Sequence, residues 1–537
     1  MSTKNNIRYQ SKIRSGTIRL ITILVLIGVL GFATIPKYAI SWDEEASMKV
    51  VHVNHDIVTG IKDYHTHLEY YGTLFNLAAD VLYKGQEIIT APISSETNEL
   101  KARIALKHRF TFLLSLVTYV AVAGLVGILA GFEFAWLGPL LLLLMPRFWG
   151  HSLFNPKDIP FAMMFTLGTW LGTYLISYYH RQQSKLSIGL NGTTVYSALY
   201  GILVGCGAGA RIDASVLVAF VPLVDVLLRL QGGEKLKQIL RFGQFYGVML
   251  VTCILTIITL YPASWANPIR WYLEAFNFYY KEDWPHTVLF NGSSIPAKTV
   301  PWYYLPTWVG ITTPVVVLLL LVAGLILATL KYRRLSVGQR ACLLLLGLQI
   351  LGLPVFAMLY QATLFDGLRT VLYLLPAIAT ISAVAIAWLY QILRPQLAKL
   401  TLVAVFIALA LPIWVDMVRL HPYEYVYFNR TFGGLPAASE RFETDYWGLS
   451  MAEAVIWLNQ HQDRTLPLVS TEPLISVKLL ADQDLTVIPY EKFEANGKPF
   501  YYLSLPRWGW EQRFAECPVV YSVNRQQAPL AIVKQCS

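Results

Sequence analysis

The sequence predicts an α-helical polytopic membrane protein with a small α/β domain after its last membrane helix. Of its 537 residues, 55% are hydrophobic and only 14% are charged, whereas about a quarter of the residues of a soluble domain are charged. About eleven apolar runs, each of roughly 15 to 23 residues, are close to the length that crosses a bilayer. The placement of lysine and arginine between these runs then predicts the orientation of the chain.

The apolar runs follow one another along most of the chain. The first run lacks a small-residue cleavage site before the acidic cluster that follows it, so we expect a retained helix rather than a removed signal peptide. The third run is short, and only a few residues separate it from the fourth. The runs lie near residues 18–36, 110–130, 134–148, 160–178, 193–210, 214–230, 243–261, 308–330, 341–360, 370–390 and 400–415.

Short basic segments connect the runs on one side of the membrane. They read "YYHRQQSK", "RLQGGEKLKQILR", "KYRRLSVGQR" and "LRPQLAK", as the positive-inside rule requires of cytoplasmic loops. We therefore predict a cytoplasmic N-terminus, a membrane domain over residues 1–415 with a large outer loop at 37–108, and an extracytoplasmic domain over residues 416–537. The net charge of +10 mostly reflects this asymmetry, so we expect no nucleic-acid partner.

The segment after residue 416 has the pattern of a small α/β domain. Strand-like runs read "LPLVST", "DLTVIPY", "PFYYLSL" and "PVVYSV". Ser450 and Glu453 have the spacing of a capping box before an amphipathic helix. Cys517 and Cys536 are either free or paired, and an oxidising compartment would favour a disulfide. The sequence leaves open whether this domain selects an acceptor, acts as a lid or docks a partner.

Charged residues gather in the loops expected on the outer side. The first outer loop opens with "SWDEEA", which places Asp43 and Glu44 directly after a membrane helix. Three cations lie near membrane depth, where an unpaired charge is costly: Lys157, Arg211 and Arg369. Each has an ordinary explanation, because such side chains snorkel and because acids follow two of them closely in the sequence. Together they favour an anionic ligand at the membrane surface, such as a lipid phosphate.

These features resemble the GT-C superfamily of polyprenyl-phosphate-dependent glycosyltransferases, in particular the branch of protein O-mannosyltransferases and the aminoarabinose transferase of lipid A. The similarity rests on the acidic "DE" after the first helix, on short third and fourth helices, and on an arginine at the outer start of a late helix, in "FDGLRTVLYLLPAIA". "HSLFNPKDIPFA" and "HPYEYVYFNRTFGGL" are similar to segments of bacterial members. The first loop departs from the family, since "HTHLEYYGTLF" stands where a His-Pro-Pro or Lys-Pro motif is common.

The resemblance implies a glycosyltransferase of the plasma (inner) membrane that moves a sugar from a polyprenyl-phosphate donor to a protein, lipid or glycan acceptor on the extracytoplasmic face. It implies that Asp43 is the base of an inverting displacement and that Glu44 positions the acceptor or partners a cation. The three cations then bind the donor phosphate. Further candidates for binding the acceptor or the sugar are His67, Glu69, Tyr70, Asn155, Asp158 and Trp271.

Other readings stay open at this point. No Cys/His spacing predicts a metal site, and a divalent cation near His67 and Glu69 is an alternative. A transporter or flippase for a lipid-linked saccharide would need polar helix interiors and repeat symmetry, but the apolar runs are nearly free of charge and no repeat is found. A non-catalytic membrane assembly protein is the remaining alternative, and it would make the acidic loop dispensable.

Overall fold

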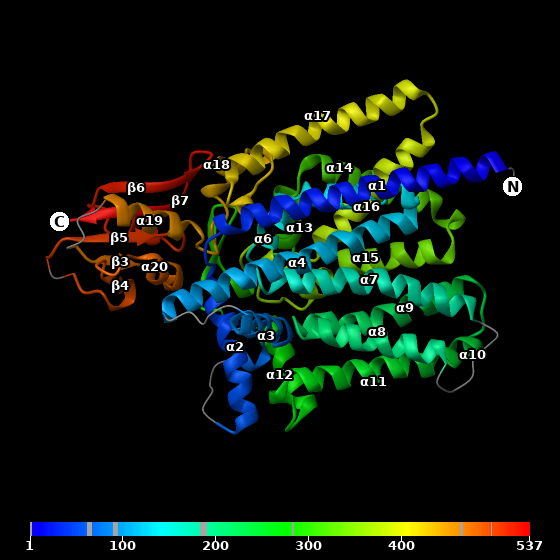
Figure 1. The fold of residues 1–537 in the computed structure, drawn as a ribbon, viewed down its shortest axis with the longest axis horizontal. Helices are drawn as coiled ribbons and strands as arrows, with labels where there is room; N and C mark the ends of the chain where they lie inside the picture. Colours follow the sequence, from blue (N-terminus) through cyan, green and yellow to red (C-terminus); the bar gives the residue numbers. More distant parts are fainter. Residues whose placement is uncertain are drawn as a thin grey trace.

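A computed structural model of the chain describes residues 3–61, 67–89, 95–182, 191–281, 284–461, 466–495 and 497–537. Long helices run side by side in one bundle, and a five-stranded sheet lies at one end of it (Figure 1). The N-terminus lies at the other end of the bundle (Figure 1). The first helix therefore crosses the bundle toward the sheet, and the loop that follows it lies beside the C-terminal region.

Eight helical segments in the described part of the chain are long and apolar enough to cross a membrane, so the protein is a multi-pass membrane protein. The first begins at Ile13 within α1 (Thr3–Thr34), and the others contain α4 (Glu96–Ala130), α7 (Asp158–Arg181), α10 (Leu236–Ile239) with α11 (Gly243–Leu260), α14 (Val315–Lys331), α15 (Val337–Leu359), α16 (Leu374–Ile392) and α17 (Gln396–Leu420). Two further predicted runs form α8 (Gly192–Ala208) and α9 (Leu217–Gln231), which have 17 and 15 residues.

Proline interrupts two of the predicted runs. The run near 134–148 is divided between α5 (Leu137–Leu143) and α6 (Pro146–Ser152), because the residue before a proline is pushed out of the helical conformation and Met145 is extended. The run near 308–330 is divided in the same way between α13 (Tyr304–Thr312) and α14, with Thr313 extended before Pro314. These two runs are therefore not single helices.

The loops on the side of the sheet carry structure of their own. They contain α2 (Trp42–Thr59), α3 (Leu74–Ile89) and α12 (Pro268–Lys281). An antiparallel hairpin of β1 (Thr287–Phe290) and β2 (Ser293–Pro296) follows α12. The predicted elements do not include this hairpin, although its Asn-Gly turn, with positive φ at both residues, is the common signal for a two-residue hairpin loop.

The C-terminal sheet has the strand order β4-β3-β5-β7-β6. β3 pairs in parallel with β4 and β5, and β7 pairs antiparallel with β5 and β6. All four strand-like runs form strands, and only the last strand of this sheet was not predicted. The strands are β3 (Leu468–Ser470), β4 (Val487–Pro489), β5 (Phe500–Ser504), β6 (Val519–Arg525) and β7 (Ala528–Cys536), and the helices beside them are α18 (Gly434–Ser439), α19 (Ser450–His461) and α20 (Leu474–Leu480).

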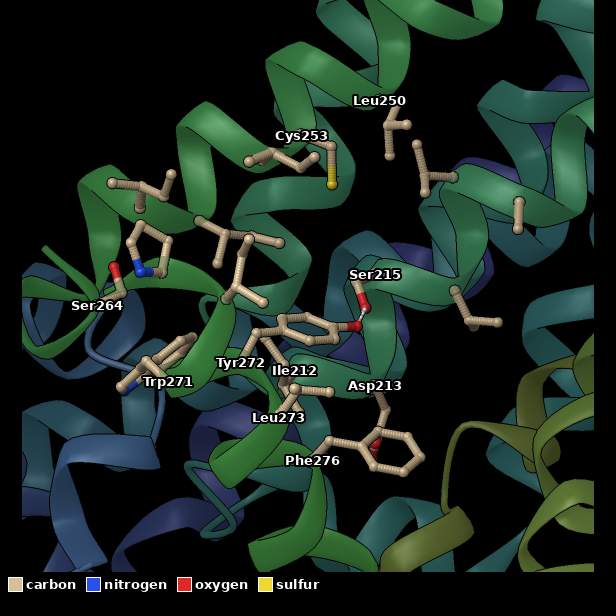
Figure 2. Close-up of a pocket in the computed structure, with 18 of the residues that line it drawn as sticks. Ile212, Asp213, Ser215, Leu250, Cys253, Ser264, Trp271, Tyr272, Leu273 and Phe276 are labelled. Atoms are coloured by element: carbon tan, nitrogen blue, oxygen red, sulfur yellow. Dashed lines mark hydrogen bonds between the residues drawn. The ribbon is translucent and has the colours of Figure 1, made fainter. Parts of the chain in front are cut away.

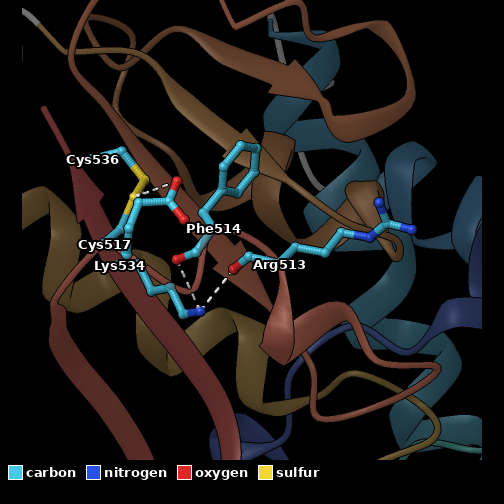
Figure 3. Close-up of a disulfide and its surroundings, with 6 residues drawn as sticks. Arg513, Phe514, Cys517, Lys534 and Cys536 are labelled. Atoms are coloured by element: carbon cyan, nitrogen blue, oxygen red, sulfur yellow. Dashed lines mark hydrogen bonds between the residues drawn. A yellow bond between two sulfur atoms is a disulfide. The ribbon is translucent and has the colours of Figure 1, made fainter.

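Two local expectations for this region have different outcomes. Cys517 and Cys536 form a disulfide (Figure 3), which decides between the two alternatives. The predicted capping box of α19 is wrong, because Ser450 is already the first residue of the helix. The carboxylate of Asp445 accepts a hydrogen bond from the backbone N–H of Ser450 at 2.8 Å, and Glu453 pairs instead with an arginine of β6.

The C-terminal region contacts the chain directly before Asp43. The backbone N–H of Trp42 donates to the carbonyl of Trp447 at 3.1 Å, and the hydroxyl of Ser476 donates to the carbonyl of Ile40 at 2.6 Å. These bonds fix the first turn of α2 against the C-terminal region, and Asp43 is the second residue of that turn.

Candidate active site

Four cations and three carboxylates line one cavity of about 140 Å³ beside the first turn of α2. They come from segments far apart in the sequence: α2, the loop before α7, the loop after α8, the segment between α15 and α16, and the turn after β5. Two more carboxylates, Asp213 and Glu443, pair with two of the cations. The charged lining residues are Asp43, Lys157, Asp158, Arg211, Asp366, Arg369 and Arg507.

Asp43 is the carboxylate on which two of the predicted cations converge. Nη2 of Arg369 lies 3.0 Å from Oδ2 of Asp43, and Nζ of Lys157 lies 3.8 Å from the same oxygen. The side chain of Asp43 is 23% exposed, whereas those of the two cations are 16% and 10% exposed. The cavity thus presents a carboxylate to solvent with two largely buried cations beside it.

Arg211 and Arg369 belong to the same ionic network. Asp158 joins them, with one oxygen 3.3 Å from Nη1 of Arg211 and the other 3.7 Å from Nε of Arg369. Local pairs also exist, since Asp213 lies 2.7 Å from Arg211 and Asp366 lies 2.9 Å from Arg369. The buried Nε atoms of both arginines make no hydrogen bond to any described residue. Each guanidinium therefore retains an unused N–H donor.

The cations of the cavity differ in how firmly they hold their charge. Burial lowers the pKa of Lys157, although Asp43 opposes the shift, and its ammonium lies 4.1 Å from the ring centre of Tyr71. Burial also acts to lower the pKa of Arg369, but Asp43 and Asp366 outweigh it and hold that pKa above its ordinary value. Arg369 is thus a fixed positive charge, and Lys157 is a cation that an anionic ligand would stabilise further.

Glu44, which was expected to position the acceptor or partner a cation, does not line the charged cavity. Its side chain is fully buried. One carboxylate oxygen accepts the backbone N–H of Ser41 at 2.5 Å, and the other lies 2.7 Å from Nε2 of His108. Glu44 is the third residue of α2 and closes the capping box of that helix. Neighbouring residues of a helix point about 100° apart, so Asp43 faces the cavity while Glu44 faces α4.

Asn155 shapes the loop that carries two of the cavity residues. Its side-chain oxygen accepts the backbone N–H of Lys157 at 3.1 Å and that of Asp158 at 2.9 Å, and its amide donates to Asp158 at 2.9 Å. Asn155 is fully buried and is absent from the cavity lining. It therefore positions the loop rather than contacting a ligand.

The other predicted residues lie next to the cavity. His67, Glu69 and Tyr70 form one short turn, η2 (His67–Tyr70), and the ring of His67 stacks on Phe278, which lines the cavity. Within the described residues no group of three His, Cys, Asp or Glu side chains is placed to hold a metal ion. The ring of Trp271 lies 6.2 Å from that of Tyr70 and lines a second cavity.

This second cavity has a volume of about 710 Å³ and lies between α9, α11, α12 and α15 (Figure 2). Its lining is almost wholly apolar and includes Trp271, Phe276 and Phe356, with Asp213 among its few polar groups. A small cavity of about 40 Å³ shares Asp213 with this apolar cavity and Arg211 with the charged cavity. The three cavities therefore form a row that leads from an apolar chamber to Asp43.

Comparisons with known proteins find similarity in fold but not in sequence. No protein-family model matches the chain, and a search of the curated proteins finds no match. The apo oligosaccharyltransferase of Archaeoglobus fulgidus superposes with a TM-score of 0.51 at 11% identity, over 87% of this chain and 64% of that one. ArnT of Cupriavidus metallidurans in the apo state has a TM-score of 0.48 at 14% identity, over 96% of this chain and 98% of that one. The chain has the GT-C fold.

The predicted site residues do not include the charged residues at the far side of the cavity. Nη2 of Arg507, from the turn after β5, lies 2.5 Å from Asp366 and 3.1 Å from Glu443. Burial raises the pKa of Glu443 to about 7, although Arg507 opposes the shift. The available signal was "RWGW", an arginine beside two tryptophans in a loop directly after a predicted strand.

Proposed function

We propose that this protein is a membrane glycosyltransferase that moves a sugar from a polyprenyl-phosphate donor to an acceptor hydroxyl. The observation that carries the proposal is the row of cavities, which is apolar between the helices and ends at Asp43 with its two cations. The GT-C fold, shared with an oligosaccharyltransferase, agrees with this chemistry. The proposed site of transfer is the extracytoplasmic face of the plasma (inner) membrane.

The donor has an apolar chain and a charged phosphate, which match the apolar cavity and the charged cavity of the row. A polyprenyl chain is apolar and fits the apolar cavity, because burying its methylene and methyl groups there removes them from water. Its phosphate needs cations at the end of that cavity, and Arg211 is the first one reached. Lys157 and Arg369 complete the phosphate site. Arginine contacts a phosphate with two parallel N–H donors, and lysine contacts it as a single point charge.

The reaction follows from the position of Asp43. Its carboxylate takes the proton of the acceptor hydroxyl, and the acceptor oxygen forms a bond to the anomeric carbon of the sugar. The bond between that carbon and the phosphate oxygen breaks, and its electron pair leaves with the polyprenyl phosphate. One displacement of this kind inverts the anomeric configuration. The growing negative charge on the leaving phosphate is stabilised by Arg369 and Lys157.

Donor binding would also change what Asp43 contacts. Without donor, Arg369 and Lys157 are paired with Asp43. The donor phosphate is a diester with one negative charge, so it competes with Asp43 for both cations. The carboxylate of Asp43 then becomes available to accept a hydrogen bond from the acceptor. The proposal therefore expects the donor to bind before the acceptor.

The first test is mass spectrometry of lipids that co-purify with the protein. The wild type should carry a polyprenyl phosphate or its glycoside, and the Lys157→Ala, Arg211→Ala, Arg369→Ala triple variant should lose it. Lys157→Ala alone tests the same site with less risk to folding, and Arg419→Ala, which changes an exposed arginine of α17, is the matched control. Bulk phospholipid alone in every sample would count against a lipid-phosphate donor.

The second test separates chemistry from binding. Asp43→Asn keeps the size of the side chain and removes its capacity to take a proton. It should abolish transfer without lowering the amount of folded protein, and it should still retain the donor lipid. Transfer at the wild-type rate in this variant would eliminate Asp43 as the base.

The orientation is tested by labelling. The basic loops predict that the C-terminal region is extracytoplasmic. A cysteine placed at the exposed Gln527 should react in intact cells with a maleimide that cannot cross the membrane. Labelling only after the membrane is broken would place the C-terminal region in the cytoplasm and contradict the proposed orientation.

A further inference from the structure

Three tryptophans contact one another beside the charged cavity, and one of them, Trp42, lines it. Trp42 lies beside Asp43 on α2 and lines the cavity together with Arg507. Its ring centre is 6.0 Å from that of Trp508 and 6.4 Å from that of Trp510, and the last two are 4.9 Å apart. All three side chains are half-buried. We name Trp42, Trp508 and Trp510 the tryptophan wall.

The turn that carries two of these tryptophans is fixed in an unusual conformation. Trp508 has a φ of +55°, a region that residues with a side chain adopt at an energetic cost. Its indole N–H donates to the carbonyl of Thr287 at 2.8 Å, and its ring stacks on His286 at 4.1 Å. Arg507 holds the same turn through Asp366. The surrounding contacts therefore determine the shape of the turn and the positions of its rings.

Partly exposed indole rings beside charged groups form a surface of mixed chemistry. A sugar ring has one apolar face of C–H groups and a rim of hydroxyls. The C–H groups carry a small positive charge and pack on the negative face of an aromatic ring, while the hydroxyls bond to neighbouring charged side chains such as Asp366 and Arg507. An extended peptide is more often held through its backbone by a sheet edge. The wall offers side chains from two distant segments instead.

We propose that the tryptophan wall binds the sugar ring of the acceptor, so that the acceptor is a saccharide and the new bond is a sugar–sugar glycosidic bond. This inference rests on the proposed function and adds the class of acceptor. The acceptor ring packs on Trp510, and one of its hydroxyls reaches Asp43 past Trp42. That hydroxyl gives its proton to Asp43, and its oxygen takes the sugar as the polyprenyl phosphate leaves.

The experiment identifies the product in cells that lack the chain and carry it back in four forms. The forms are the wild type, Asp43→Asn, Trp510→Ala and Trp302→Ala. Trp302 is 72% exposed and absent from the cavity lining, so it is the matched control for the loss of a tryptophan. Glycolipids, polymeric glycans and proteins are extracted separately, and tandem mass spectrometry with linkage analysis finds species that gain one sugar in the wild type but not in Asp43→Asn.

The expected product carries the added sugar on a hydroxyl of another sugar. Trp510→Ala should lower its yield about three- to tenfold, in line with the energy of an aromatic contact, and Trp510→Phe should restore part of it because the ring face is kept. Trp302→Ala should match the wild type. Thermal unfolding of each purified variant shows whether a loss of yield reflects a loss of folded protein.

Two results overturn the inference but leave the proposed function standing. One is a sugar attached to serine, threonine or a phosphate group in a species that depends on Asp43. The other is a saccharide product whose yield is the same in Trp510→Ala as in the wild type. The proposed function itself fails if no species in any fraction differs between the wild type and Asp43→Asn.

Discussion

Arg369→Met removes the cation that joins the most carboxylates in the charged cavity. Nη2 of Arg369 lies 3.0 Å from Asp43 and Nη1 lies 2.9 Å from Asp366. At an effective dielectric constant of about 20, each contact of that length has a Coulomb energy of about 5–6 kcal/mol. The net effect is smaller, since removing one partner of a buried pair costs about 3–5 kcal/mol. We therefore expect this variant to lose about 3–5 kcal/mol of its free energy of unfolding.

The same substitution should slow transfer by more than its effect on stability explains. Losing one donor that stabilises developing charge costs about a hundred- to a thousandfold in rate. Adding Asp366→Asn removes one of the carboxylates that lose an arginine partner, so we expect part of the stability to return. The rate should not return, because the leaving phosphate still lacks its arginine.

The assay has two readouts, equilibrium unfolding in mixed detergent micelles and the transfer rate in liposomes that contain the donor lipid. Arg419→Met changes an exposed arginine and should alter neither readout. If Asp366→Asn restored the rate together with the stability, Arg369 would be a structural partner of the carboxylates and not a ligand of the phosphate. Wild-type stability in Arg369→Met would refute the electrostatic reasoning itself.

Three more predictions follow from the described contacts. Glu44→Gln should lower the free energy of unfolding by about 1.5–3 kcal/mol, because it weakens charged hydrogen bonds to Ser41 and His108. The transfer rate should stay within a few-fold of the wild type. An inactive variant with a normal yield of folded protein would instead support a catalytic role for Glu44. Because the pKa of Glu443 is raised to about 7, the folded state holds its proton more tightly than the unfolded state, so stability should fall as the pH rises from the ordinary glutamate range through 7. In Glu443→Gln, denaturant titrations between pH 4 and 8 should show a smaller decrease of the free energy of unfolding with pH. An unchanged decrease would mean that another group causes it. Replacing both Cys517 and Cys536 by serine should lower the unfolding free energy of the C-terminal region by about 3 kcal/mol, as expected for a loop closed over 19 residues; equal resistance to proteolysis before and after would contradict this.

The parts of the fold that follow from strong local rules were predictable. A run of apolar residues in a bilayer has to satisfy its own backbone hydrogen bonds, which favours a helix whatever its neighbours are. Lys157, Arg211 and Arg369 were identifiable because a cation near membrane depth needs a partner. Met145 and Thr313 mark the limit of hydropathy alone, since the prolines that follow them break otherwise continuous apolar runs.

The other parts of the site depend on contacts between segments far apart in the sequence, which no local sequence pattern indicates. Arg507 pairs with Asp366 over a sequence separation of 141 residues, and neither surrounding segment indicates the other. Asp43 and Glu44 are adjacent and chemically alike, so their sequence context does not distinguish the one that faces the cavity. The difference arises because His108, 64 residues after Glu44, fixes the rotation of α2.

The contacts of Arg507 also connect the two ends of the chain mechanically. Arg507 contacts Asp366, Asp366 contacts Arg369, and Arg369 contacts Asp43, at 2.5, 2.9 and 3.0 Å. A tilt of the C-terminal sheet against the helices would pull on this series and change the distance between Arg369 and Asp43. A partner that tilted the sheet would in this way act on the carboxylate of Asp43. A sheet exchanged for that of another protein would need an arginine at the same turn to keep this response.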